Sequence, residues 1–485
     1  MSDILLVNPL FLRDDPTEHR LMTPYFPLGL LYLAATARQA GYTVSLFDGM
    51  FAGGADDFVA ALERERPKVV GISVLATVRA SALRLAEMAH RRGATVVVGG
   101  ADPTGRPESY LEHRDNGERV VDVVAIGEGE QTFLELLPLL LGDGGSRDAL
   151  GSVAGLAYVN EAGEAVRTAA RRHCRDLDSL PLPARDLIDI EAYRRAWVGR
   201  HGYFSLSIIT SRGCPYGCKW CQKSVFGKSY RPRSPEAVAE EMRLIKEQYH
   251  PDQLRIVDDV MGVDRRWVRA WRDAVLQRGA SIPFECLSRV DLLDEEVLRL
   301  LKEAGCIRIA LGAESGSQKV LDAMNKGTKV EQIRRAAELC RRQGIETYFY
   351  IMLGYPGEEW PDIIKTVLLL KETRPTTFSS TIAYPLPGTA FYEEVQHRLF
   401  DAPDWDYTAE NRLLFQRDYS TRFYRWVQRW LHHEWRVARL RHNDEPASLV
   451  GRLHARAALW LARGMVELLR RAAALRGGAA ERGDT

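Results

Sequence analysis

Short apolar runs alternate with amphipathic stretches over the first 145 residues. The strand-like runs are 4–7, 43–47, 69–74, 95–98 and 121–126. The helical patterns between them are 28–39, 57–65, 80–92 and 131–141. Continuous Val, Ile and Leu runs separated by amphipathic helices are typical of a parallel sheet with helices on both faces. The pattern predicts a doubly wound, Rossmann-like α/β domain over 1–145, with its ligand beyond the carboxyl ends of the strands.

A second alternating series fills residues 199–395. Its strand-like runs are 207–210, 253–257, 283–288, 308–311, 347–352 and 378–383. Its helical stretches are 235–248, 266–277, 294–303, 330–343 and 359–372. Six βα units predict a partial (β/α)6 barrel, with functional residues at the carboxyl ends of its strands. Residues 146–198 between the two domains are predicted to be a linker.

The composition changes after the barrel. From Asp404 onward the chain has fifteen Arg and no Lys, against ten Asp and Glu. The apolar residues of this part recur at helical spacing. We expect a helical region over 396–475 and a disordered tail over 476–485. Two interpretations remain open: a helical cap packed on the barrel mouth, or a basic amphipathic surface that contacts a membrane or a lipid-like substrate.

Composition and charge exclude several classes of protein. The chain has 485 residues, of which 46% are hydrophobic and 27% charged, as in globular proteins. Its net charge of +1 provides no basic field for nucleic acid. Seven cysteines are too few for a disulfide framework. No basic leader opens the chain and no apolar run approaches the ~18 residues of a membrane span. We therefore expect a cytoplasmic protein without a transmembrane segment.

Three cysteines form the strongest chemical motif. Cys214, Cys218 and Cys221 are spaced CxxxCxxC in SRGCPYGCKWC, directly after an apolar run. Thiolates at this spacing can converge on one metal centre. Three of them leave one iron of a cubane cluster open to a further ligand. The alternative is a zinc loop whose fourth ligand is distant, such as Cys174 or His201.

The motif, with Trp220 before its last cysteine, resembles the signature of the radical S-adenosylmethionine (SAM) superfamily. The runs IALGAESGSQ, YIMLGYPGE and AYPLPGTAFY are similar to those of the branch with an N-terminal cobalamin-binding domain. The pieces YFPLGLLYLAA, GGADPT and VDVVAIGEGEQTF resemble that branch too. The resemblance covers about residues 1–400. It implies a cobalamin-binding first domain and a radical SAM barrel.

The resemblance also assigns roles to residues of the barrel. The three cysteines would ligate a 4Fe–4S cluster, and SAM would chelate the open iron. Arg289 would bind the SAM carboxylate, Trp220 the adenine, and Glu314 the ribose or amine. The alternatives are simple packing for Trp220 and helix capping for Glu314. Further expected SAM contacts are Gly312, Ser315 and Pro356. Asp258 and Asp259 either contact SAM or substrate, or cap a loop.

In the first domain, the expected cobalamin contacts follow the third, fourth and fifth strands. They are Ser73, Val74, Leu75, Gly99, Gly100, Thr104, Gly127, Glu128 and Gly129. Glycines there let a ligand approach the backbone closely. The motif DxHxxG, which supplies a lower axial histidine, is absent. We therefore expect base-off cobalamin without a histidine ligand.

The function implied by the resemblance is reductive cleavage of SAM to a 5′-deoxyadenosyl radical, followed by methylation of an unactivated carbon or phosphorus centre through methylcobalamin. The alternative is an oxidative cyclase or ring-rearranging enzyme of the anaerobic tetrapyrrole cyclase type. A tRNA methylthiolase would need three N-terminal cysteines, and none precedes Cys174. The expected partners are a small-molecule substrate, with a hydrophobic one as an option, and an external one-electron reductant such as flavodoxin or ferredoxin. No nucleic acid is expected, and peripheral membrane contact through the C-terminal basic helices remains open.

Overall fold

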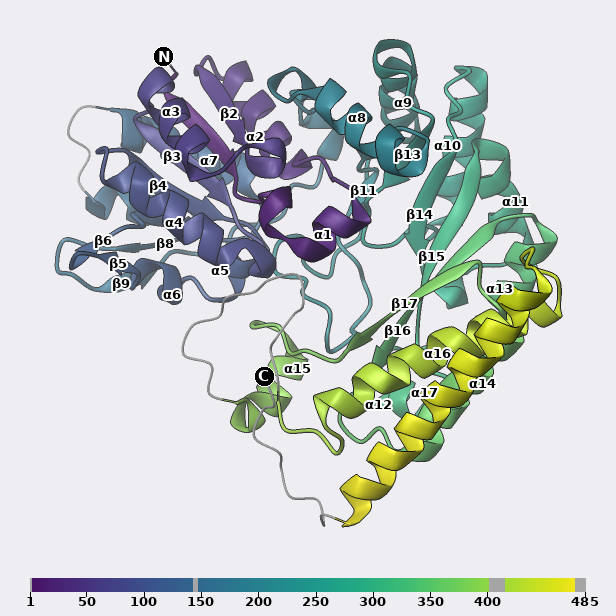
Figure 1. Ribbon diagram of the computed structural model, residues 1–485. Coiled ribbons are helices and arrows are strands. Elements are labelled where there is room, and N and C mark those ends of the chain that lie inside the picture. Colours follow the sequence, from purple (N-terminus) through teal and green to yellow (C-terminus); the bar gives the residue numbers. More distant parts are fainter. Residues whose placement is uncertain (1, 143–146, 401–414, 476–485) are drawn as a thin grey trace.

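The computed structural model describes residues 2–142, 147–400 and 415–475. The first domain holds a sheet in the order β2-β1-β3-β4-β7-β8-β9, in which the first five strands are parallel (Figure 1). These five are β1 (Ile4–Asn8), β2 (Val44–Asp48), β3 (Val69–Ser73), β4 (Thr95–Gly99) and β7 (Val123–Ala125). The main helices are α2 (Leu28–Gln39), α3 (Ala55–Glu65), α4 (Arg79–His90) and α7 (Gly129–Leu141). The doubly wound prediction is confirmed.

Strand alternation explains why helices cover both faces of this sheet. In β1, Ile4 and Leu6 belong to one apolar core with side chains of α2 and α7, whereas Leu5 and Val7 belong to another with side chains of α3 and α4. The chain reverses its winding direction between β1 and β3, so the loops that follow these two strands diverge. A crevice at such a switch point is the usual ligand site of open α/β sheets.

The segment 146–198, predicted as a linker, contains regular structure. Strands β8 (Leu156–Val159) and β9 (Ala165–Arg167) extend the first sheet by antiparallel pairing after β7. Helix α8 (Ile190–His201) then leads into the barrel. Its Tyr193 donates to Asp48 over 2.7 Å, and its Trp197 donates to the carbonyl of Pro24 over 3.0 Å. The segment therefore joins the domains as a packed element.

The second domain is an open barrel of six parallel strands in sequence order, which confirms the predicted partial barrel. The strands are β10 (Ser205–Ile208), β13 (Gln253–Ile256), β14 (Phe284–Ser288), β15 (Cys306–Glu314), β16 (Glu346–Leu353) and β17 (Thr377–Ile382). The covering helices are α9 (Pro235–Tyr249), α10 (Arg265–Gln277), α11 (Glu295–Ala304), α13 (Val330–Arg342) and α14 (Trp360–Thr373). The shorter elements are α1 (Pro16–Leu21), α5 (Ala101–Gly105), α6 (Glu108–Leu111), β5 (Arg114–Asp115), β6 (Glu118–Arg119), β11 (Ser211–Arg212), β12 (Arg231–Pro232), α12 (Gln318–Ala323) and α15 (Ala390–Val395).

Charged side chains form a ladder near the amino ends of neighbouring barrel strands. Glu285 on β14 accepts from Arg255 over 2.5 Å and from Arg308 over 3.3 Å. Arg308 also pairs with Glu346 over 2.6 Å. These side chains alternate with the apolar ones that face the helices, so they point into the lumen. The ladder lines the lumen at the end opposite to the strand ends that carry the candidate site.

The C-terminal helices α16 (Thr421–Arg441) and α17 (Leu449–Leu475) pack against each other, and α16 also packs on α14 (Figure 1). Side chains of α16 donate to backbone carbonyls at the barrel's edge: Gln428 to Ser380 over 2.6 Å, and Trp435 to Pro375 over 2.9 Å. The pair therefore lies along the last strand, where it covers an edge that could otherwise pair with another chain. The start of α16 reaches the carboxyl ends of the last strands, where Tyr424 lies beside Gly354.

Two predictions concern the rest of the chain. No helix among the described residues is long and apolar enough to cross a membrane. The predicted disordered tail, 476–485, lies outside the described residues.

A buried ion-pair triad ties the segment 146–198 to the barrel. Arg185 contacts Glu241 of α9 over 2.8 Å and donates to the carbonyl of Ser207 on β10. Arg233 pairs with the other oxygen of the same carboxylate. Burial works to raise the pKa of Glu241, but the charges of Arg185 and Arg233 outweigh it and hold that pKa below its usual value. Loss of the Glu241 charge would leave both buried guanidinium groups without their shared carboxylate.

We expect Glu241→Gln to lower the free energy of unfolding by about 3–5 kcal/mol, because it leaves buried arginine charge without its partner. The measurement is denaturant unfolding of the purified protein. The matched control is Glu240→Gln on the same helix, whose half-exposed carboxylate pairs with Arg243 at the surface and should contribute far less to stability. Equal losses from the two variants would contradict the role given to the triad.

Candidate active site

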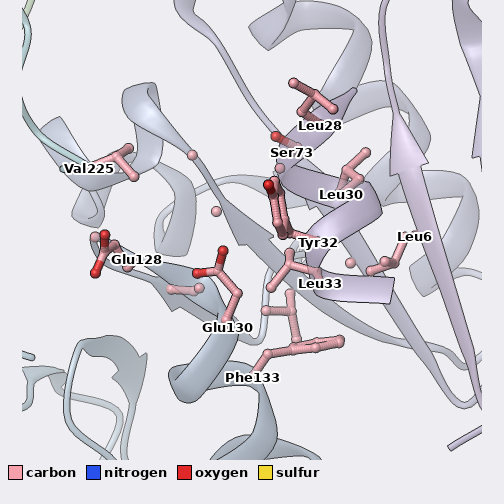
Figure 2. A pocket seen from close by; sticks show the side chains of 18 of the residues that line it. Leu6, Leu28, Leu30, Tyr32, Leu33, Ser73, Glu128, Glu130, Phe133 and Val225 are labelled. Carbon is pink, nitrogen blue, oxygen red and sulfur yellow. The ribbon is translucent and has the colours of Figure 1, made fainter. Parts of the chain in front are cut away.

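A cavity of about 150 Å³ lies in the first domain, at the side of the sheet covered by α2 and α7 (Figure 2). Apolar side chains make much of its wall: Leu6, Leu28, Leu30, Leu33 and Phe133. The barrel closes it with four residues: Ile209, Arg212, Val225 and Phe226. The cavity therefore lies at the contact between the two domains.

Most of the predicted cobalamin contacts line this cavity. They are Ser73, Gly99, Gly100, Gly127, Glu128 and Gly129. Three others lie elsewhere: Val74 is in the core, Leu75 is 44% exposed, and the Thr104 hydroxyl accepts from the amide of Gly127 over 3.1 Å. Gly100, at φ +109°, must be glycine because a Cβ there would lie 2.7 Å from the carbonyl oxygen of Val74.

The wall that α2 supplies, which includes Gly29 and Tyr32, was not predicted from the sequence. The run YFPLGLLYLAA, which covers the start of this helix, was the signal available in the sequence. The four barrel residues of the wall could not be predicted from a local sequence pattern, because the first-domain residues that they face lie far away along the chain.

Buried ion pairs join the acidic turn before α7 to the cysteine-bearing segment. Glu130 pairs with Arg212 over 2.6 Å, and Glu128 pairs with Arg231 over 2.8 Å. Glu128 also accepts from the amide of Cys174 over 2.7 Å. All four charged side chains are at most 10% exposed. We refer to these two ion pairs as the interdomain clamp.

The three cysteines lie on the loop that joins β11 to β12, which we call the cluster loop. Cys214 and Cys218 are half-buried and Cys221 is exposed. Burial raises the pKa of the Cys214 thiol, so its thiolate form needs the positive charge of a metal. The next residue, Gln222, donates to the carbonyl of Ala101 in the first domain over 3.3 Å. The cluster loop therefore contacts the domain that holds the cavity.

Two aspartates after β13 hold the start of the cluster loop. The buried Asp258 accepts from the amide of Thr210 and from the hydroxyl of Ser211, each over 2.6 Å. Asp259 accepts from the amide of Gly213 over 3.1 Å. Burial raises the pKa of Asp258 to about 6. Both aspartates therefore have the loop-capping role that the sequence left open.

Arg289 stands beside the cysteines at the end of β14. Its guanidinium lies 3.7 Å from Cys218 Sγ and 3.6 Å from the centre of the Tyr216 ring. Asp291 holds it with two contacts of 3.0 and 3.1 Å, and the carbonyl of Lys326 accepts from it over 2.8 Å. The planar group is thus fixed next to the cluster loop.

Glu314, at the end of β15, forms a buried ion pair with Lys326 over 2.9 Å. Lys326 Nζ also lies 5.0 Å from the centre of the Trp220 ring. Lys326 was not predicted from the sequence. Its side chain contacts Glu314 and Trp220, and its backbone carbonyl accepts from Arg289, so it links the three predicted residues beside the cysteines.

Backbone geometry makes room for the Glu314–Lys326 ion pair. Glu314 has φ +58°, a left-handed conformation that is costly for a residue with a side chain and is often found at functional sites. A Cβ on Gly312 would lie 2.4 Å from Glu314 Oε1 and 2.5 Å from Lys326 Nζ. Gly312 thus leaves the space that the ion pair occupies.

The other two predicted SAM contacts have different surroundings. The Ser315 hydroxyl lies 3.1 Å from that of Thr366 on α14, so it faces the helix layer. Pro356 is half-buried in the turn after β16, where the carboxylate of the buried Glu358 accepts from the amide of Gly354 over 2.6 Å. This contact fixes the turn. Burial raises the pKa of Glu358 to about 8.

The donor set fits an iron–sulfur cluster with one open iron. In the part of the chain that the structure describes, no group of three His, Cys, Asp or Glu side chains is placed so that it could hold a metal ion, so the fit rests on the kind and spacing of the three thiols. The cluster loop offers three thiols, with Arg289 and the Glu314–Lys326 pair next to it. Such an arrangement can hold an anionic, amino-acid-like ligand against the open iron.

Comparisons with known proteins agree with the two domains. The Radical SAM superfamily model matches residues 208–370, and the B12 binding domain model matches residues 21–137. Hopanoid C-3 methylase of Methylococcus capsulatus is 32% identical over 402 residues, which cover 81% of this chain and 70% of that protein. Anaerobic magnesium-protoporphyrin IX monomethyl ester cyclase of Rubrivivax gelatinosus is 26% identical, covering 79% of this chain and 69% of that protein.

Among solved structures, the radical SAM methyltransferase TsrM of Kitasatospora setae, with cobalamin and a 4Fe–4S cluster bound, has a TM-score of 0.67. It is 22% identical and the match covers 83% of this chain and 76% of that one. This likeness shows the fold.

We expect Asp258→Ala to reduce the iron content of the anaerobically purified protein to less than half, because the amide of Thr210 and two hydroxyl groups lose their buried partner. Asp258→Asn should keep most of the iron, since its amide can both accept from Thr210 and donate to a hydroxyl. The measurement is iron and sulfide per chain. Similar iron in the Ala variant and the unmodified protein would contradict the capping role.

Proposed function

Because the chain belongs to the radical SAM enzymes that carry an N-terminal B12-binding domain, we propose that it methylates an unactivated carbon or phosphorus atom of a small molecule. One observation carries the proposal: the interdomain clamp ties the rim of the first-domain cavity to the segment that bears the cysteines. Cobalamin anchored in that cavity by its nucleotide tail and SAM on the cluster loop would then meet at the same domain contact.

When bound, a 4Fe–4S cluster on Cys214, Cys218 and Cys221 supplies the electron for SAM cleavage, and cobalamin in the first domain supplies the methyl group. Arg289 offers a planar fork to the SAM carboxylate, and Asp291 keeps that fork from turning.

Lys326 and Glu314 place opposite charges at the position proposed for the SAM amine and ribose. Trp220 supplies a ring against which the adenine can stack. The half-buried Pro356 in the turn after β16 gives that ligand an apolar edge.

The proposed cobalamin is base-off, without a protein histidine ligand. The cavity wall, as the described residues form it, contains no histidine. Two histidines of the first domain are paired elsewhere: His90 with Glu118 over 3.5 Å and His113 with Glu87 over 2.9 Å. An apolar, glycine-rimmed cavity is suited to the nucleotide tail of the cofactor.

The proposed substrate is hydrophobic. In the barrel lumen, Val257 and Tyr350 are 40% and 42% exposed, and the ring centres of Tyr350 and Tyr348 lie 5.0 Å apart. Tyr350 pairs in register with Gly312, so it adjoins the Glu314–Lys326 pair. Apolar and aromatic walls next to the proposed SAM site favour a substrate of the same character.

The exposed Cys221 gives an external reductant access to the cluster loop. We propose a one-electron donor such as flavodoxin or ferredoxin. The second candidate reaction is oxidative cyclisation without net methyl transfer, which the 26% identity to the cyclase favours. It would use the same two cofactors, so its product distinguishes it.

The test is anaerobic purification with cobalamin supplied, then turnover with a reductant, methyl-labelled SAM and an apolar cell extract as the source of substrate. We expect about four iron and one cobalt per chain, release of 5′-deoxyadenosine, and transfer of the label to an apolar product. Cys218→Ala should remove iron and SAM cleavage while cobalt stays. Gly99→Leu should remove cobalt while iron stays, because a side chain there fills the cavity.

The matched control is Gly199→Leu on α8, where a Cβ meets nothing within 4 Å and cobalt should stay. Iron without cobalt in the unmodified protein would contradict methyl transfer through cobalamin. An unlabelled cyclised product would establish the second candidate instead.

We expect Lys326→Met to weaken SAM binding at least tenfold, because Glu314 then keeps a buried charge without its partner. The measurement is anaerobic equilibrium dialysis with labelled SAM, at matched iron content. Lys329→Met, three residues on and exposed, should bind SAM as the unmodified protein does. Unchanged affinity in Lys326→Met would remove Lys326 from the site.

A further inference from the structure

Helix α17 carries apolar side chains on two opposite faces. One face packs on the rest of the protein through Ala455, Ala462 and Val466, which are at most 3% exposed. The other face is turned to solvent in the described structure. Its exposed members are Leu449, Val450, Leu453, Trp460, Leu461 and Leu468. We call these six residues the outer stripe.

The outer stripe is broad and strongly exposed. Trp460 is 76% exposed and Leu449 is 73% exposed, the highest values among the large apolar side chains of the described chain. At about 100° per residue, the six side chains fall on one side of the helix. Figure 1 shows α17 on the outside of α16, at the margin of the molecule. Packing within the protein therefore does not account for this stripe.

A row of arginines runs beside the outer stripe. Arg452, Arg456, Arg463 and Arg470 follow one another at intervals of four, seven and seven residues, which keeps them on one shoulder of the helix. Arg463 lies 3.9 Å from Glu434 of α16 and keeps a side chain that is 63% exposed, whereas Arg452 donates to the carbonyl of Leu440 over 2.7 Å. The only acidic residue of α17 is Glu467, and it pairs with Arg470 and Arg471, each over 2.8 Å. With five Arg and one Glu, the helix carries a charge of +4.

Charge decides between two occupants of this surface. A second copy of the chain docked antiparallel about a two-fold axis would bring like-charged arginine rows close together, which disfavours association. An anionic phospholipid surface offers phosphate groups to the arginines and an acyl boundary to the leucines and the tryptophan. Of these two occupants, only the anionic phospholipid surface complements both the arginine row and the apolar outer stripe.

We propose that α17 is an interfacial helix that docks the enzyme on membranes containing anionic phospholipid. The outer stripe inserts at the level of the headgroups and upper acyl chains, and the arginine row contacts lipid phosphates. α17 lies in the plane of the interface and does not cross the bilayer. This surface is separate from the candidate active site and does not depend on the proposed reaction.

The test is co-sedimentation of the full-length holoenzyme with vesicles of phosphatidylcholine alone or mixed with phosphatidylglycerol. We expect at least tenfold tighter apparent binding to the anionic vesicles, weakened by salt. The triple variant Leu453→Ser, Trp460→Ser, Leu468→Ser should lose at least tenfold in binding. The double variant Arg456→Gln, Arg463→Gln should lose the preference for anionic lipid.

Matched controls separate insertion from general stickiness. Leu276→Ser on α10 and Leu368→Ser on α14 remove leucines that are 48% and 44% exposed, and they should bind as the unmodified enzyme does. Vesicles with brominated acyl chains should quench part of the tryptophan fluorescence, and Trp460→Phe should abolish that part. Iron content and circular dichroism confirm that the triple variant is folded.

Two results would overturn the proposal. One is binding to anionic vesicles by the folded triple variant with the affinity of the unmodified enzyme. The other is a dimer in light scattering that the triple variant converts to a monomer, without vesicle binding by either form. That second result would assign the outer stripe to another copy of the chain.

Discussion

The interdomain clamp is the interaction on which the candidate site depends. Glu128 and Glu130 stand on the turn that leads into α7, and Arg212 stands two residues before the first cysteine of the cluster loop. The carboxylates and guanidinium groups are buried, so neither side can lose its partner without leaving a costly charge in the interior. The same contacts that join the domains therefore also set the position of the cysteines relative to the first-domain cavity. A change that loosens the packing of the two domains would therefore also displace the cysteines from the cavity.

Around the cysteines, polar contacts of three kinds limit movement. Asp258 and Asp259 hold the entry of the cluster loop through its amides and hydroxyls. Arg289 is held by Asp291 and by a backbone carbonyl. Gly312 and the left-handed Glu314 create the volume in which Lys326 forms its ion pair. Each charged group that faces the ligand is thus fixed by a second group behind it, which keeps the site in order before a ligand binds.

Periodicity along the chain predicts both sheets, because parallel strands and amphipathic helices leave a strong local pattern. The cysteine spacing predicts the cluster loop for the same reason: its members are neighbours in sequence. Contacts between distant residues have no such signal. Arg212 and Glu130 are 82 positions apart, and Lys326 follows Glu314 by 12 positions in a loop with no motif. The strands β8 and β9 lie in a segment expected as a linker because they are only four and three residues long, and because β8 pairs with β7, which lies far back along the chain.

The C-terminal helices differ in how much of their surface the fold requires: the packing of the protein explains the contacts of α16 but not the outer face of α17. Helix α16 covers the open edge of the barrel, and its contacts with β17 explain why Trp435 and Gln428 are placed where they are. α17 needs only its inner face, with Ala455, Ala462 and Val466, to pack on α16. Leucine and tryptophan on the outer face add nothing to that packing and expose a large apolar surface, which favours aggregation unless a partner covers it. The arginines beside this surface disfavour a like-charged partner, so the composition of α17 agrees with the negatively charged, apolar interface that we propose for it.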